Sequence, residues 1–201
     1  MPEILELIDQ LDKELLLSIQ RQSSPFLDFL MAAITDKYNW IPLYLVLLIG
    51  LFRQFGWQAV YFVLAVVVLI TLSDQLTSSL MKPYFGRFRP CHDPEIGHLV
   101  RIVTRCGGSY GFVSSHAANS VAVSTFFILI FRKSHPFVWL VIIWPLVVCY
   151  SRMYLGVHYP LDILGGTAVG VGLGYLVYWG TQKLSMIVPF KFKPASGNRF
   201  D

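Results

Sequence analysis

The chain has little charge for its size. Of its 201 residues only 14% are charged, whereas 55% are hydrophobic, and its mean hydropathy is +0.57. A soluble domain of this length needs more polar surface, so the composition excludes one and indicates an integral membrane protein. The net charge is only +4, and the basic residues lie beside apolar segments, so no nucleic-acid partner is indicated.

Other familiar signals are also absent from the sequence. The N-terminus lacks the basic region and small-residue cleavage site of a removable signal peptide. No long linker or low-complexity run divides the chain, which predicts a single domain over residues 1–201. The sequence also lacks a carboxylate cluster suited to Mg²⁺ and the cysteine spacing of a zinc site. We therefore expect no metal and no cofactor.

The apolar segments are long enough to cross a bilayer, which takes about 20 residues, or fewer where flanking groups reach the interface. The candidate spans are Ile41–Phe52, Trp57–Leu80, Ser120–Phe131, Pro136–Tyr150 and Leu161–Tyr178. Pro25–Thr35 is left open as a sixth, because it is short and contains Asp28. The sequence thus predicts an all-α integral membrane helical bundle of about six transmembrane helices.

Residues 1–22 have the periodicity of an amphipathic helix, with Ile4, Leu7 and Leu11 on one face and acidic residues on the other. One interpretation is an interfacial helix along the membrane surface, and the other is a helix packed on the bundle. Because its polar face is mostly acidic, attraction to anionic lipid does not hold it there.

Three polar islands interrupt the apolar sequence: Lys82–Pro90, Phe112–His116 and Ser151–Asp162. Ionisable groups at a membrane boundary cost free energy, so a functional site is the default hypothesis. For any single island the alternative is a charged loop that anchors helix ends. Counting the spans places all three islands on one face of the membrane, with residues 82–113 as the active-site loop.

These islands contain the groups needed to cleave a phosphate ester without a metal. Cations must surround the phosphoryl oxygens, and Lys82, Arg89 and Arg152 supply them. His158 and Asp162 are spaced i, i+4, so the carboxylate can orient the imidazole as a nucleophile. The remaining requirement is an acid for the departing oxygen, and His116 is the candidate.

The same three islands resemble the signature motifs of the type 2 phosphatidic acid phosphatase superfamily, which includes lipid phosphate phosphatases and the soluble vanadium haloperoxidases. The resemblance implies that His158 forms a phosphohistidine, that Asp162 orients it and that His116 is the acid. The residues that it assigns to phosphate binding are Lys82, Arg89, Ser114 and Arg152.

The second motif departs from the family, because Pro-Ser-Gly-His is replaced by Val-Ser-Ser-His at residues 113–116. Ser115 can still offer its backbone N–H to phosphate if its φ is negative. A left-handed conformation at Ser115 would instead add strain of about 1 kcal/mol or more.

The resemblance predicts a hydrolase acting on a lipid phosphate or diphosphate in the bacterial inner membrane. Undecaprenyl diphosphate is the first expected substrate, followed by phosphatidylglycerophosphate or phosphatidic acid and then lipid A phosphate. A haloperoxidase is disfavoured because that family is soluble and needs vanadate. A transporter or scaffold would also house charges, but it needs no His158–Asp162 pair beside three cations.

Basic residues near the span ends weakly favour an extracytoplasmic active site and a cytoplasmic tail at residues 184–201. Cys91 and Cys106 lie in the active-site loop, and a disulfide between them fits only an oxidising compartment. Such a bond would close a loop of about 15 residues and contribute roughly 3 kcal/mol. Two free thiols are the alternative.

Gly166, Gly170 and Gly174 recur at four-residue intervals in the last span. Small residues on one helical stripe let another helix backbone approach closely. Packing inside the bundle and a homodimer through this stripe are both open from the sequence.

Overall fold

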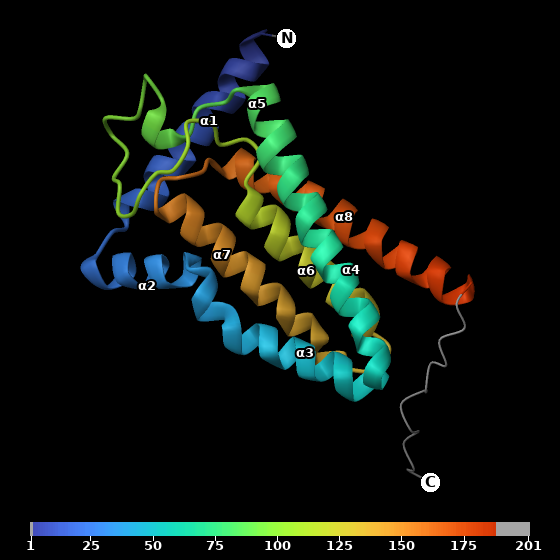
Figure 1. Ribbon diagram of the computed structural model, residues 1–201. Coiled ribbons are helices and arrows are strands. Elements are labelled where there is room, and N and C mark those ends of the chain that lie inside the picture. The colour runs from blue at the N-terminus through green and yellow to red at the C-terminus, as the bar shows by residue number, and fades with distance from the viewer. Residues whose placement is uncertain (1, 188–201) are drawn as a thin grey trace.

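The computed structural model describes residues 2–187, which form α-helices with no β-strand in that range. The helices pack as a bundle, and the long loop between residues 85 and 115 gathers at one end (Figure 1). This confirms the predicted all-α bundle. Residues 188–201, which make up most of the predicted cytoplasmic tail, lie outside the described part of the chain.

The chain forms eight α-helices within the described residues: α1 Pro2–Arg21, α2 Pro25–Thr35, α3 Ile41–Phe55, α4 Ala59–Asp74, α5 Lys82–Phe85, α6 Ser115–Phe131, α7 Ile143–Tyr154 and α8 Pro160–Ile187. A π-helical segment, Gln75–Met81, joins α4 to α5. Gly56, with φ +57°, ends α3 and lets the chain reverse into α4, so α3 and α4 run in opposite directions (Figure 1).

Three apolar helical stretches are long enough to cross a membrane: Lys37–Phe85, Pro136–Tyr154 and Pro160–Leu184. The first contains both α3 and α4, and α6 is apolar but shorter. Large apolar side chains on these helices are exposed, including Leu64 on α4, Leu146 on α7 and Leu164 on α8. Such a surface is expected of helices that contact lipid.

The segment that the sequence left open, α2, has 11 residues. At a rise of 1.5 Å per residue its length is about 16 Å, roughly half of the hydrocarbon core. Asp28 of α2 forms a bidentate ion pair with Arg101 of the long loop. The Arg101 nitrogens Nη1 and Nη2 lie 2.6 and 2.7 Å from the two carboxylate oxygens. Hence α2 is too short to cross alone, and its first turn is fixed against the loop.

The glycine stripe of α8 packs against α6 at the centre of the bundle. A Cβ placed on Gly166 would lie 2.5 Å from the carbonyl oxygen of Ser114, and one on Gly170 would lie 2.6 Å from that of Ala118. Gly174 meets Ala122 in the same way, at 2.7 Å. The structure therefore supports packing inside the bundle, because α6 occupies the surface of this stripe, and it gives no support to a homodimer through the stripe.

The N-terminal helix α1 is amphipathic as predicted, and its orientation is specific. Ile4, Leu7 and Leu11 are exposed on its apolar face. Asp9, Asp12 and Lys13 contact the long loop and the start of α8, where Asp12 is buried. The face of α1 that contains Asp12 and the fully buried Leu16 is thus packed on the protein, and the apolar face formed by Ile4, Leu7 and Leu11 is open.

Candidate active site

The first polar island folds back along the segment that precedes the second. Gly86, with φ +58°, ends the short helix α5 and redirects the chain. The Arg89 N–H then donates to the carbonyl of Ser109 at 2.9 Å, and the Gly111 N–H donates to the carbonyl of Arg87 at 2.8 Å. These bonds hold Arg87 and Arg89 beside the start of α6.

The second island forms the N-terminus of α6. Ser114 is its N-cap, with a side-chain oxygen that accepts from the Ala117 N–H at 3.4 Å. Its own N–H donates to the carbonyl of Asp162 at 3.0 Å, which ties this island to the third. Among the described residues only glycines have positive φ, so Ser115 has the negative φ that it needs. The strain foreseen for a left-handed Ser115 does not arise.

The Ser115 hydroxyl has a role that a glycine cannot fill. Lys82 donates to this hydroxyl through its Nζ at 2.8 Å. Thr77, in the π-helical segment, donates to the same oxygen at 2.9 Å. The substitution in the second motif therefore links Lys82 of the first island to the start of α6.

The third island lies between α7 and α8 and contains the predicted histidine–aspartate pair. Nδ1 of His158 lies 3.3 Å from Oδ2 of Asp162, and its Nε2 lies 3.1 Å from Nη1 of Arg89. Because a guanidinium only donates, Nε2 must be the acceptor and Nδ1 must carry the proton. His158 therefore holds a lone pair on Nε2 and points it toward a cation.

Burial holds the pKa of His158 well below its usual range, and the positive charges of Arg89, Arg152 and Lys82 lower it further. The imidazole is consequently neutral at pH 7, which is the form of a histidine that can attack an electrophile. Asp162, with a side chain that is fully buried, also accepts from the Tyr159 N–H at 3.0 Å. These contacts fix the orientation of the imidazole.

His116 and Arg152 complete the set of predicted residues. His116 lies within electrostatic range of His158, Arg152, Lys82 and Arg89, and it lines a cavity of about 810 Å³ between α3, α4, α6 and α7. Arg152 donates to Thr35 at 2.8 Å. The Nε atoms of Arg89 and Arg152 are both buried and lack a partner within the described residues, so each arginine has a free donor.

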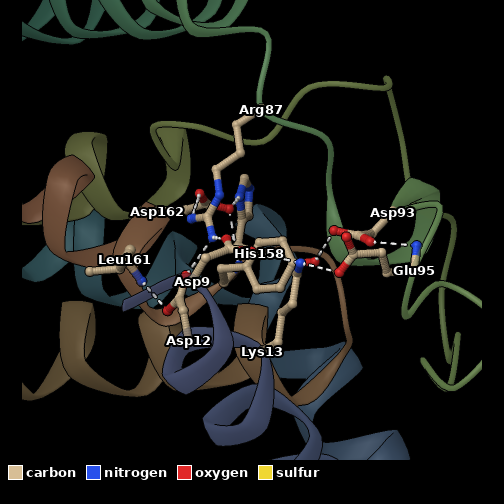
Figure 2. A network of polar contacts seen from close by, with 10 residues as sticks. Asp9, Asp12, Lys13, Arg87, Asp93, Glu95, His158, Leu161 and Asp162 are labelled. Atoms are coloured by element: carbon tan, nitrogen blue, oxygen red, sulfur yellow. Dashed lines mark hydrogen bonds and ion pairs between the residues drawn. The ribbon is translucent and has the colours of Figure 1, made fainter. Parts of the chain in front are cut away.

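Arg87 is a site residue that the sequence pattern did not single out, although it lies in the first island. Figure 2 shows its guanidinium between Asp162 and two acids of α1. It contacts Asp162 at 3.2 Å, Asp12 at 2.7 Å and Asp9 at 3.1 Å. The acidic pattern of α1 was visible in the sequence, but nothing in it indicated that α1 reaches the site.

Gly111 is also a site residue that sequence reasoning missed. A Cβ at this position would lie 2.9 Å from Oδ2 of Asp162, the oxygen that faces His158, and 3.3 Å from Cγ of Arg89. A side chain at residue 111 would therefore push apart the groups that hold the imidazole.

The structure pairs Cys91 with Cys106, whose Cα atoms are 6.4 Å apart, a separation typical of a disulfide. The donor atoms of Cys91, His92 and Cys106 lie within 4.8 Å of one another, so the two reduced thiols and His92 would form three candidate metal ligands. A disulfide and a metal site exclude each other here, because a disulfide leaves no thiolate to bind a metal.

The comparison with protein families agrees with this geometry. The model of the PAP2 superfamily matches residues 59–186. This chain belongs to the PAP2 superfamily. The predicted resemblance is thereby confirmed, and the protein is a membrane-embedded lipid phosphatase of the PAP2 type.

Among characterised relatives, the chain is 40% identical to the lipid A 4'-phosphatase of Bacteroides thetaiotaomicron over 90% of this chain and 82% of that protein. It is 36% identical to the lipid A 4'-phosphatase of Porphyromonas gingivalis, over 87% of this chain and 74% of that protein. An undecaprenyl-diphosphatase of Sulfolobus acidocaldarius is 29% identical over 70% of this chain and 62% of that protein.

Two solved structures share the fold. The transmembrane PAP2-type phosphatidylglycerolphosphate phosphatase of Bacillus subtilis matches with a TM-score of 0.68 and 22% identity, over 97% of this chain and 90% of that one. LpxE of Aquifex aeolicus matches with a TM-score of 0.62 and 24% identity, over 82% of this chain and 92% of that one. At these identities the likeness is evidence of the fold alone.

Proposed function

We propose that this PAP2 phosphatase removes a phosphate group from lipid A, in a metal-independent reaction that passes through a phosphohistidine at His158. The observation that carries the chemistry is the neutral imidazole held between Asp162 and Arg89, with its Nε2 lone pair on the side of the cations. The choice of lipid A rests on the two lipid A 4'-phosphatases that align with most of this chain.

In the first step the phosphate oxygens are bound by Lys82, Arg89 and Arg152, which neutralise charge in the transition state. Arg89 moves its Nη1 from Nε2 of His158 to a phosphate oxygen, which frees the lone pair. Nε2 attacks phosphorus and the bond from phosphorus to the lipid oxygen breaks. The anionic phosphate offsets the cations around His116, so we propose that His116 is protonated when substrate is bound and gives this proton to that oxygen, and the lipid leaves as an alcohol.

In the second step water attacks the phosphohistidine. His116, now neutral, accepts a proton from this water, the P–N bond breaks, and inorganic phosphate departs. His158 is restored as a neutral imidazole and His116 as the acid. Throughout the cycle Asp162 accepts a hydrogen bond from the Nδ1–H of His158 and stabilises the positive charge that develops on the imidazole ring.

The cavity beside His116 supports a lipid substrate. It runs from Ser115 and His116 into apolar side chains such as Leu47, Val123 and Phe127. A cavity that is polar at the reacting end and apolar beyond it suits a phosphorylated headgroup with acyl chains.

The sequence placed undecaprenyl diphosphate first among substrates, and it now stands second. The undecaprenyl-diphosphatase relative covers less of the chain at lower identity than either lipid A phosphatase does. Location in the bacterial inner membrane with an extracytoplasmic active site is part of the same proposal. The paired Cys91 and Cys106 in the active-site loop support an oxidising compartment.

The test is phosphate release by the purified protein from lipid A, undecaprenyl diphosphate, phosphatidylglycerophosphate and phosphatidic acid, compared by kcat/KM with and without EDTA. We expect lipid A to be hydrolysed best and chelation to have no effect. A higher kcat/KM for undecaprenyl diphosphate would replace the proposed substrate. The His158→Ala variant is the control for contaminating phosphatase.

A further inference from the structure

Arg87 connects the N-terminal helix to the carboxylate that orients His158. Its Nη1 donates to Oδ1 of Asp162 at 3.2 Å, and its Nη2 donates to Oδ2 of Asp12 at 2.7 Å (Figure 2). The opposite oxygen of Asp162, Oδ2, faces Nδ1 of His158 at 3.3 Å. One chain of charge-assisted hydrogen bonds thus runs from α1 to the imidazole.

Asp12 also holds the backbone that carries Asp162. Its Oδ1 accepts from the Leu161 N–H at 2.9 Å. Leu161 lies in the first turn of α8, where N–H groups have no partner within the helix and the helix dipole favours negative charge. The two oxygens of one carboxylate therefore bind the Arg87 side chain and the residue next to Asp162.

Asp12 and Asp9, one helical turn apart on α1, differ in how far their side chains are exposed to solvent. The Asp12 side chain is only 2% exposed and the Asp9 side chain is 43% exposed, although both contact Nη2 of Arg87. Water screens an exposed pair strongly, so Asp9 contributes little. A buried carboxylate costs free energy unless it is paired and hydrogen-bonded, and Asp12 satisfies both conditions.

We propose that Asp12 is a positioning residue for the phosphatase reaction, which acts through Arg87 and the Leu161 backbone to fix Asp162 against His158. This proposal rests on the proposed function, because it assumes that His158 is the nucleophile. It makes the N-terminal helix part of the catalytic apparatus, even though α1 lies outside the family match at residues 59–186.

The consequence for catalysis follows from how Arg87 is shared. When Asp12 is uncharged, Asp162 is the one buried anionic partner of Arg87 that remains among the described residues. The guanidinium then pulls Asp162 toward itself, and the Asp162–His158 bond lengthens. An imidazole that is poorly oriented attacks more slowly, whereas phosphate still binds to Lys82, Arg89 and Arg152. The loss should appear in kcat, with KM little changed.

The experiment compares Asp12→Asn with Asp9→Asn in the full-length protein, using the best substrate of the phosphate-release panel. Asparagine keeps an oxygen for the Leu161 N–H but removes the charge. We expect Asp12→Asn to lower kcat at least tenfold with KM within about twofold, and Asp9→Asn to stay within twofold in both. A folded Asp12→Asn protein with wild-type kcat would overturn the proposal.

A double-mutant cycle separates positioning from a structural effect. If Asp12 acts through Asp162, its replacement should change little once Asp162→Asn has already removed the carboxylate. The same tenfold loss in both backgrounds would refute the proposal. Should Asp12→Asn not fold, Arg87→Lys gives the test, because lysine keeps the charge but lacks the planar fork whose separate nitrogens reach Asp162 and Asp12. It should lower kcat in the same way, and a wild-type kcat would refute the proposal.

The panel also distinguishes this inference from the proposed function. A wild-type protein that hydrolyses none of the lipid phosphates, or a His158→Ala variant that remains active, would contradict the proposed function. If the wild type is active, His158→Ala is inactive and Asp12→Asn is fully active, the role of Asp12 alone is refuted.

Discussion

Lys82 and Ser115 are joined by a 2.8 Å hydrogen bond from Nζ to Oγ. Ser115 stands where the PAP2 motif has glycine, so this protein fixes the lysine of its first motif with a hydroxyl from its second. The hydroxyl does not consume the lysine, since an ammonium group has three donors. It selects one position of a long, flexible side chain beside the proposed phosphate site.

Removing that hydroxyl should weaken phosphate binding. In Ser115→Ala we expect KM, and the inhibition constant for vanadate, to rise at least about tenfold, since a hydrogen bond to a charged group contributes about 1.5–3 kcal/mol and each 1.4 kcal/mol is a factor of ten. The value of kcat should change less. Ser124→Ala is the matched control, because the Ser124 hydroxyl, also on α6, donates to the Val141 carbonyl and does not line the cavity beside His116. Equal kinetics for Ser115→Ala and wild type would contradict the assigned role.

Replacing the nucleophile should abolish the reaction. His158→Ala leaves no group that can form the covalent intermediate, so phosphate release should fall to background while the protein stays folded. Asp162→Asn should be severely impaired but retain a trace, because Asp162 orients the imidazole and does not attack. Phosphate release in detergent, with circular dichroism as the folding check, measures both. Normal turnover by His158→Ala would exclude the phosphohistidine mechanism.

Vanadate should inhibit at low concentration. It adopts a trigonal bipyramid, with equatorial oxygens for Lys82, Arg89 and Arg152 and an axial position for Nε2 of His158. EDTA should have no effect, since the proposed reaction uses these cations in place of a metal. Inhibition assays against the preferred lipid substrate provide the measurement. Strong inhibition by EDTA that added metal reverses would indicate a different mechanism.

The lowered pKa of His158 predicts a pH dependence of stability. Since the folded-state pKa lies below the unfolded value of about 6.5, the folded protein binds fewer protons in the window below that value. This contribution to stability is therefore present above pH 6.5 and is lost as the pH falls. Between pH 7.5 and 5.5 the melting temperature of wild type should fall further than that of His158→Gln.

The control for this comparison is His98→Gln, at an exposed histidine of the long loop. It should keep the wild-type decrease in melting temperature, because that histidine is not buried among cations. Equal decreases for wild type and His158→Gln would mean that His158 titrates normally.

The cysteines test the side of the membrane on which the site lies. If the active-site loop is extracytoplasmic, Cys91 and Cys106 should be linked in protein from native membranes, and reduction should lower the melting temperature. Mass spectrometry of unreduced, alkylated protein gives the answer. Two thiols that an impermeant reagent labels only after lysis would place the loop in the cytoplasm, and metal retained by the reduced protein would favour the three-ligand site.

The sequence by itself determined the membrane bundle and most of the site. Helical spans follow from apolar length, because backbone groups in lipid must bond within their own segment. The pairing of His158 with Asp162 follows from i, i+4 spacing, and counting spans correctly put Lys82, Ser115 and His158 at one end. These are properties of local periodicity and of the order of segments along the chain.

Only the tertiary structure decided which surfaces of these helices meet. The glycine stripe of α8 is equally suited to α6 or to a second chain, and the packing of α6 against Gly170 resolves the choice. The contact of Asp12 with Arg87 joins residues 75 positions apart. No periodicity encodes such a contact, since it depends on where α1 lies against the long loop. Packing geometry sets which residue a side chain contacts across the fold. The sequence determines only which kinds of hydrogen bond or ion pair that side chain can form.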